Sequence, residues 1–488
     1  MLLEQLNAFL TTSDQLKDRY SLDVTVDEVE AKNGKINAAS MTPETSIGRM
    51  ISKLRPTIYT TAGRIINASN GTFKRLRWAT RDKDKLKRYP KETKAEYNLL
   101  IRGVLSMTST AADVAQIIDL VDDRPSLSSE QQAIKSAAYF KQVRLLLGAD
   151  RQEGETRPPS TREVHAQLPK LRKLKRSLKP CRESQQLRWM GLEFASYHGC
   201  QVLIQWKTAG APDWNKYEEQ IKSLAVLLMS IHDPSFRSLE CFGYYPAESK
   251  DAHGIVYRVP DPSVSYELKT LRTLFKACSF VPLARRLEIA LALAETMLQL
   301  HTAGWMHKNL RSDNVVFLAA HGSDAQTFVL SRPYVVGYEY ARPDTWDAAQ
   351  KYTSYLEFDL EEELYRHPQT CGADRQTYQK RFDMYALAAV LVELVAWKPL
   401  LDIQSTFTKP GLADEIARAG EDGNATSLPS LHDLFESKKC LAFLEHQAGS
   451  EVVGMIRSCS TMKSADDGGD ASLETQASMV EKLSWCRI

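Results

Sequence analysis

The chain has 488 residues, of which 43% are hydrophobic and 25% are charged, and its formal net charge is +2 at pH 7. This length exceeds what one hydrophobic core usually serves, and it predicts two or three domains. The near-neutral charge gives no global electrostatic reason to expect nucleic acid as a partner, and the composition is ordinary for a globular protein.

All eight cysteines follow residue 180, and no two of them form a Cys-x-x-Cys pair. Reduced thiols in a cytoplasmic protein therefore fit better than a disulfide framework or a structural zinc site. The chain does not open with a basic segment followed by an apolar one, so no secretory signal is expected. The best apolar run, Ala386–Trp397, contains Glu393 and is shorter than the roughly 20 residues that a membrane span needs.

Residues 1–148 carry apolar residues at helical spacing and few strand-like runs, which predicts an all-α helical bundle. Within them, Ser128–Leu147 opens with serines followed by glutamate and glutamine, a pattern typical of a helix start. Phe73–Tyr89 is basic and amphipathic, and it fits an ordinary surface helix as well as a face for an acidic membrane or a partner.

Residues 149–184 change in character and predict a linker that is first polar and then basic. The basic part, Lys170–Lys179, gathers positive charges that would suit an acidic membrane surface. Charge runs of this kind are more commonly just solvated, and a solvated linker or helix face is the interpretation that we favour.

From Leu187 onward, short strand-like runs alternate with helical ones, which predicts an α+β domain over residues 185–488. The expected elements are a strand, a helix, two strands, a long helix and two short strands: Gln201–Trp206, Tyr217–Ser230, Cys241–Tyr245, Gly254–Val259, Leu283–His301, Val315–Leu318 and Thr327–Leu330. The remainder, including Leu441–Arg487, is expected to be helical with loops.

The segment His307–Asn314 reads His-Lys-Asn-Leu-Arg-Ser-Asp-Asn and resembles the catalytic loop of the protein kinases, H-R-D-L-x-x-x-N. It follows a long helix by a short turn, and the order strand–helix–strand–strand–helix–loop is also that of this family. The resemblance implies a two-lobed kinase-like fold, with a small lobe over residues 185–260 and a large lobe over residues 261–488. His307 would then be a structural residue of the loop.

The departures from the family pattern fall on residues that carry the chemistry. Asn309 stands where the resemblance places the catalytic aspartate, and an amide is a far poorer proton acceptor than a carboxylate. Arg311 keeps a cation that would meet a phosphate, and Asn314 keeps an amide oxygen that would ligate magnesium if Mg-ATP bound. The resemblance therefore implies a loop of the family's shape with impaired phosphoryl transfer.

The resemblance also assigns residues to nucleotide binding. Lys207 resembles the strand-end lysine that pairs with nucleotide phosphates, and Glu219, or its neighbour Glu218, would be its partner on the next helix. A strand-end lysine alone is more often simply exposed, so this assignment depends on the downstream motifs. Arg188–Cys200 lacks the G-x-G-x-x-G spacing of a phosphate-covering loop, which argues against tight ATP binding.

Two further segments extend the resemblance downstream of the loop. Tyr334–Glu339 resembles the metal-binding D-F-G region, with Gly337 at the aspartate position and Tyr338 in the packing role of the phenylalanine. Phe382–Leu394 resembles the central buried helix of the large lobe. Asp383 in its first turn would accept backbone N–H bonds from the loop and hold its shape.

The N-terminal part resembles the helical prion-inhibition-and-propagation (HeLo) domain of fungal proteins that join it to a divergent kinase-like domain. The residues that carry this resemblance are Arg75–Leu86, a basic segment with one tryptophan, followed by a long helix. The resemblance implies a helical domain that can act at membranes in cell-death signalling. Because the chain opens directly at Met1, without the apolar first helices of such domains, we expect an N-terminally truncated form.

These observations predict a multidomain chain in which an all-α bundle is joined to an α+β, two-lobed kinase-like domain. The expected function is that of a cytoplasmic, catalytically impaired kinase-like (pseudokinase) signalling protein, as in fungal cell-death or incompatibility signalling. Protein partners are expected, with no specific nucleic acid, no resident metal and at most weak binding of ATP and magnesium. Two alternatives stay open: an atypical but active ATP-dependent protein kinase, and a membrane-active effector that works through the helical domain.

Overall fold

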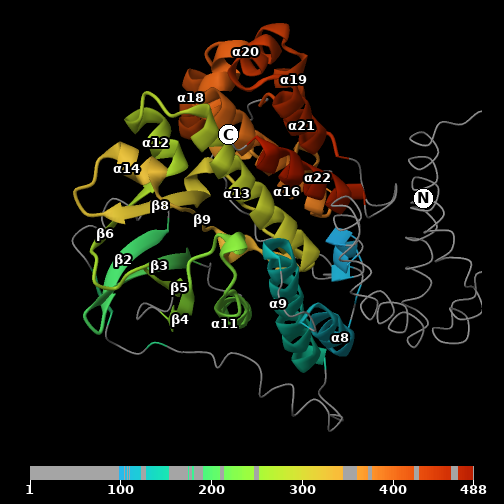
Figure 1. Cartoon of the computed structure of the whole chain (residues 1–488). Coiled ribbons are helices and arrows are strands. Elements are labelled where there is room, and N and C mark those ends of the chain that lie inside the picture. The colour runs from blue at the N-terminus through green and yellow to red at the C-terminus, as the bar shows by residue number, and fades with distance from the viewer. Residues whose placement is uncertain are drawn as a thin grey trace, which may run out of the picture. The chain divides into compact units, whose positions relative to one another are not determined.

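In the computed structural model (Figure 1), the described residues are 98–152 with gaps at 100, 104, 107, 109 and 123–127, then 174, 178–180, 191–208, 214–246, 252–343, 360–371, 376–422, 428–462 and 471–486. The contacts divide the chain into two compact units, Met1–Gln131 and Gln132–Ile488. The described part of the first unit is helical, whereas the second unit mixes helices and sheets. A multidomain chain with a helical N-terminal part and a mixed C-terminal part is therefore confirmed.

The described part of the first unit includes helix α8 (Ala111–Asp122), and helix α9 (Ser129–Gln152) begins at the boundary. The start of α9 is the predicted one, because Ser128 Oγ accepts from the Gln131 N–H (3.3 Å) and Gln131 Oε1 accepts from the Ser128 N–H (3.2 Å). Further along α9, Phe140 packs against the ring of Trp305 at 5.7 Å between centroids. Most of α9 thus belongs to the second unit, whereas the sequence analysis grouped it with the bundle.

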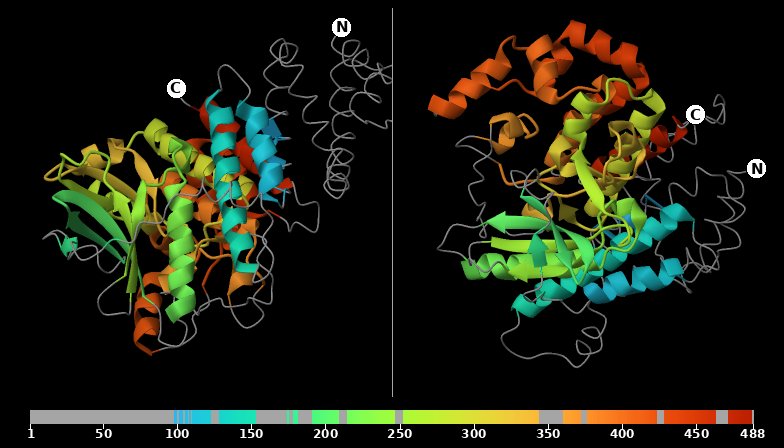
Figure 2. Two further views of the ribbon diagram at one scale, coloured as in Figure 1. Left: turned by 90° about the horizontal axis from the view of Figure 1, so that it is seen from below. Right: turned by 90° about the vertical axis from the view of Figure 1, so that its left-hand side faces the viewer.

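After α9, the second unit contains a five-stranded antiparallel sheet in the order β1-β2-β3-β5-β4. Its strands are β1 (Leu178–Pro180), β2 (Leu192–Tyr197), β3 (Cys200–Thr208), β4 (Cys241–Pro246) and β5 (Ala252–Arg258). Helix α11 (Trp214–Met229) packs against β4 and β5 (Figure 2). The strands and the helix that the sequence predicts between Gln201 and Val259 are therefore all present.

Part of the predicted linker contributes to this sheet. Leu174 is buried in the sheet's core with Val202 and Val256, and its N–H donates to the carbonyl of Tyr244 at 3.0 Å. Strand β1, which begins shortly after Leu174, pairs with β2. The remaining side chains of the basic run Lys170–Lys179 lie outside the described residues, as does all of Phe73–Tyr89.

Helices make up most of the rest of the second unit, on the opposite side from the five-stranded sheet (Figure 1). The long helix α13 (Leu283–Thr302) packs against α16 (Lys380–Ala396) and α22 (Ala471–Trp485). The others are α12 (Leu271–Ala277), α14 (Ala325–Leu330), α15 (Leu360–Glu363), α17 (Leu400–Phe407), α18 (Leu412–Asp422), α19 (Leu431–Glu436), α20 (Lys438–Ala448) and α21 (Ser450–Ser460). No helix in these described ranges is long and apolar enough to cross a membrane.

Two small sheets lie among these helices. One has the order β6-β8-β9, made of Tyr266–Thr270, Val315–Ala320 and Pro333–Val335. The other pairs β7 (Trp305–Met306) with β10 (Arg342–Pro343). The strand predicted at Thr327–Leu330 is wrong, because these residues belong to helix α14. Asp324 caps that helix by accepting from the Thr327 N–H at 2.8 Å, and this local bond outweighs the strand preference of threonine and valine.

Candidate functional site

The loop His307–Asn314 lies between β7 and β8. One buried carboxylate, Asp383 in the first turn of α16, binds the start of this loop. Asp383 accepts the backbone N–H groups of His307 and Lys308, each at 2.8 Å. It also accepts from His301 Nε2 at 3.1 Å and from the Tyr378 hydroxyl at 2.8 Å. Burial opposes ionisation, but the bond from His301 and the others together hold the pKa of Asp383 below its ordinary value.

His307 is a structural residue in this geometry. Its Nε2 lies 3.1 Å from the carbonyl of Val336, and its Nδ1 accepts the N–H of Asn309 at 3.3 Å, so Nε2 carries the proton. Burial lowers the pKa of His307 to about 4, which keeps the ring neutral near pH 7. The ring packs edge-on against buried Tyr338, with 4.9 Å between centroids.

Asn309, Asn314 and Gly337 meet on the other side of the loop. Asn314 Nδ2 donates to the backbone carbonyl of Asn309 at 2.7 Å, and the Val336 N–H donates to the carbonyl of Asn314 at 2.9 Å. Gly337 has a φ of +91°, and a Cβ there would lie 2.6 Å from Asn314 Nδ2. A side chain at position 337 would therefore require Asn314 to move.

This arrangement bears on metal binding. Aspartate at position 337 would bring a carboxylate to the loop, but glycine brings none, and the amide nitrogen of Asn314 is bound to the carbonyl of Asn309. Across the described residues, no group of three or more histidine, cysteine, aspartate or glutamate side chains is placed to hold a metal ion.

Lys207 lies at the end of β3, with its Nζ 4.9 Å from the centroid of the Tyr340 ring, a cation–π distance. Of its two expected partners, Glu218 forms an ion pair with Lys222 one turn along α11 (3.1 Å), and the side chain of Glu219 lies outside the described residues.

The face of β3 that carries Lys207 is packed. Alternation along a strand puts Gln205 on this same face. Gln205 is 3% exposed and accepts from the hydroxyl of Tyr257, itself 1% exposed, at 3.1 Å. A buried glutamine–tyrosine bond therefore closes the sheet face next to the lysine.

The segment Arg188–Cys200 has no loop of the phosphate-covering kind in its described part. It consists of β2 followed by a two-residue turn, His198–Gly199, in which both residues have positive φ (50° and 83°). Tyr197 and Cys200 are directly paired across this turn. A hairpin so short leaves no run of free backbone amides around a phosphate.

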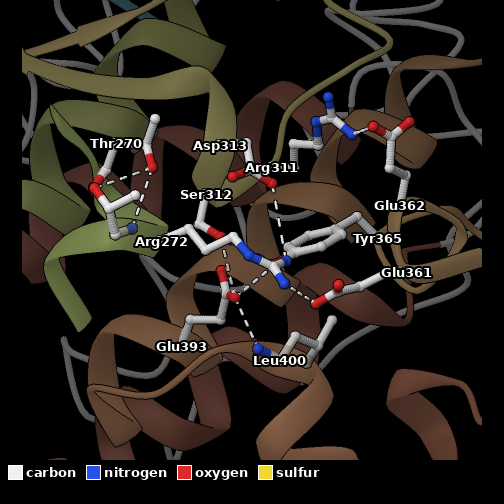
Figure 3. A network of polar contacts seen from close by, with 11 residues as sticks. Thr270, Arg272, Arg311, Ser312, Asp313, Glu361, Glu362, Tyr365, Glu393 and Leu400 are labelled. Carbon is white, nitrogen blue, oxygen red and sulfur yellow. Dashed lines mark hydrogen bonds and ion pairs between the residues drawn. The ribbon is translucent and has the colours of Figure 1, made fainter. Parts of the chain in front are cut away.

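Arg311 points to an acidic turn rather than to an open cleft. It forms an ion pair with Glu362 of α15, and Arg272 of α12 forms one with Glu361 of the same turn (Figure 3). Arg272 Nη1 also lies 3.9 Å from a carboxylate oxygen of Asp313 in the loop. This network was not predicted from the sequence, although the three consecutive glutamates Glu361–Glu363 indicate a strong local charge.

Behind this network lies a second buried carboxylate, Glu393 of α16, which is fully buried. Its Oε1 accepts from the Tyr365 hydroxyl (2.6 Å), the Ser312 hydroxyl (3.1 Å) and the Leu400 N–H (2.8 Å), as Figure 3 shows. Burial raises the pKa of Glu393 to about 8 in spite of these donors. The group is therefore mostly neutral near pH 7.

Comparison with known proteins gives one finding for the N-terminal part. Residues 1–128 match the family model HeLo, described as prion-inhibition and propagation. No curated protein matches the chain. The matched segment ends close to the boundary between the two units, at Gln131. The match supports a HeLo domain over residues 1–128, in agreement with the resemblance drawn from the sequence.

Proposed function

We propose that the chain is a signalling or regulatory protein in which a HeLo domain is joined to a protein kinase-like module without effective phosphotransfer chemistry. The observation that carries the proposal is the contact of Gly337 with Asn314 beside Asn309. The two positions at which the resemblance expects a carboxylate hold the neutral residues Asn309 and Gly337, and a side chain at position 337 would require Asn314 to move. Electrostatic stabilisation and proton acceptance are the terms that catalysis of this kind needs most.

Support for the kinase-like part comes from the order and anchoring of the elements. In chain order, β3, α11, β4, β5, α13 and the loop follow the order strand–helix–strand–strand–helix–loop of the resemblance, with β6 and α12 between β5 and α13. Asp383 binds the first two amides of the loop from the start of α16. Residues that shape the loop are thus kept, while the two carboxylates that the resemblance expects are replaced by Asn309 and Gly337.

Three features support weak nucleotide binding, because each leaves a group that would contact the nucleotide filled, missing or already paired. The Gln205–Tyr257 bond fills the sheet face next to Lys207. The turn at His198–Gly199 offers no amide cradle. Arg311, the cation that the loop retains, is engaged by Glu362.

The proposal is tested by thermal unfolding of the full-length chain with millimolar ATP, with and without magnesium. A ligand that binds only the native state must raise the melting temperature. At a ligand concentration of a hundred times the Kd, it stabilises the native state by about 2.7 kcal/mol. We expect no measurable shift for the wild type, for Lys207→Ala or for the control Lys398→Ala, which changes an exposed lysine. A shift of several degrees that Lys207→Ala abolishes, or lysine-dependent phosphate transfer, would instead favour the active-kinase alternative.

A second candidate function, a membrane-active effector, is favoured by the HeLo match over residues 1–128. If it is correct, the full-length chain should release a trapped dye from vesicles rich in phosphatidylserine but not from phosphatidylcholine vesicles. Absence of both binding and leakage at low salt would remove this candidate and leave the regulatory role.

A further inference from the structure

Arg272 and Arg311 reach one short acidic turn from two separate elements. Arg272 lies on α12 and Arg311 in the loop, while α15 supplies Glu361 to the first and Glu362 to the second (Figure 3). Two adjacent residues of one turn thus form ion pairs with two guanidinium groups from separate parts of the chain.

Both arginines are largely withdrawn from water, with side chains 23% and 13% exposed. Charge-assisted bonds between guanidinium and carboxylate are strong in such surroundings, and removing only one partner leaves an uncompensated charge. The two ion pairs therefore hold the acidic turn on the arginines. When the turn leaves, both guanidinium groups lose their carboxylate partners and can accept another acidic group.

The charged groups around Arg272 and Arg311 determine which kind of ligand the pair would bind. Arg272 and Arg311 face Asp313 from the loop and Glu361 and Glu362 from α15, and burial raises the pKa of Asp313. Behind them, the mostly neutral Glu393 adds no full charge near pH 7. Without α15, the two arginines and Asp313 leave one net positive charge, which favours an acidic ligand.

We infer that Arg272 and Arg311 form a docking site for an acidic peptide segment of a partner protein, and that α15 occupies this site as an internal competitor. The chain's own turn shows what fits: two consecutive glutamates in one helical turn, each bound to a different arginine. The site goes beyond the proposed function, because it requires neither nucleotide nor phosphate transfer.

Competition within one chain explains how the site is controlled. A tethered turn acts at an effective concentration in the millimolar range, so a partner peptide must exceed that competition to bind. Tyr365, two residues after α15, stays anchored through its 2.6 Å bond to Glu393. Displacement of α15 would therefore change the chain locally, next to the loop, and would link partner binding to the state of the loop.

The test uses the full-length chain and a fluorescein-labelled peptide with the sequence of residues 360–366, Leu-Glu-Glu-Glu-Leu-Tyr-Arg. Fluorescence anisotropy should show that the Glu361→Gln/Glu362→Gln variant binds the peptide at least about tenfold more tightly than the wild type. Adding Arg272→Gln and Arg311→Gln to that variant should remove this gain. A peptide in which the first two glutamates are glutamines should not bind.

Matched variants separate docking from general damage to the fold. Glu363→Gln changes the third glutamate of α15, for which the described structure gives no ion pair to either arginine, and it should bind peptide as the wild type does. The charge swap Arg311→Glu/Glu362→Arg should melt within a few degrees of the wild type, whereas each single change should melt lower. Equal peptide binding by wild type and the Glu361→Gln/Glu362→Gln variant, or a gain that survives loss of both arginines, would overturn the inference.

Discussion

Replacing Asp383 with alanine is expected to lower the free energy of unfolding of the second unit by about 3–5 kcal/mol, as for a buried charged group whose partners lose their acceptor. Four donors converge on this carboxylate, two of them backbone N–H groups of the loop. Asp383 is fully buried, so these donors lose their acceptor in a part of the fold that is shielded from bulk water. Urea denaturation of the full-length chain measures the loss.

Tyr378→Phe is the matched control for this prediction. It removes one donor to Asp383 and leaves the other three, so a loss of about 1 kcal/mol is expected. Hydrogen exchange gives an independent readout, because the amides of His307 and Lys308 should exchange much faster in Asp383→Ala than in Tyr378→Phe. If the two variants lose equal stability, the carboxylate does not organise the loop.

Replacing Glu393 with glutamine is expected to make the chain less sensitive to alkaline pH. The pKa of Glu393 is raised from an ordinary 4.5 to about 8 in the folded state. A raised folded pKa gives a stabilising contribution that is fully present below pH 4.5 and is lost as the pH rises towards 8. Between pH 5 and pH 8 the wild type should therefore lose about 3–4 kcal/mol of unfolding free energy relative to Glu393→Gln.

The measurement is the difference in unfolding free energy between wild type and Glu393→Gln at pH 5, 6, 7 and 8. Taking the difference cancels histidines and other groups that titrate in the same window. Glu445→Gln, on the exposed face of α20, serves as the control and should give a difference that does not change with pH. A flat difference for Glu393→Gln as well would mean that the buried carboxyl ionises as it does in water.

The sequence by itself predicted most of the elements of the second unit and the position of its loop. Helix α13, strand β3 and the hairpin formed by β4 and β5 follow from local periodicity, which depends only on which faces are apolar. The capped start of α9 followed from the side chains of Ser128 and Gln131. These elements can be predicted from the sequence because each pattern involves only residues that are close together in the chain.

Parts of the candidate site were also visible in the sequence, but only as residue types. The pattern singled out Asn309, Asn314, Gly337 and Asp383 without giving the contacts among them. The placement of Asp383 under two loop amides, 75 and 76 residues away in the chain, is a property of packed helices. No local pattern specifies which distant amides a buried carboxylate will meet.

Only the tertiary structure showed which charged groups pair with one another and which secondary structure the ambiguous segments adopt. Arg311 meets Glu362 and Arg272 meets Glu361 because α12, the loop and α15 converge, and charge alone names no partner. Residues 327–330 became helical because a cap at Asp324 competed successfully with a weak strand preference. A side chain at position 337 would displace Asn314, because Asn314 packs against Gly337. In each case the free energy of the local conformation or contact depends on neighbours that folding brings together. These neighbours cannot be identified from the linear sequence alone.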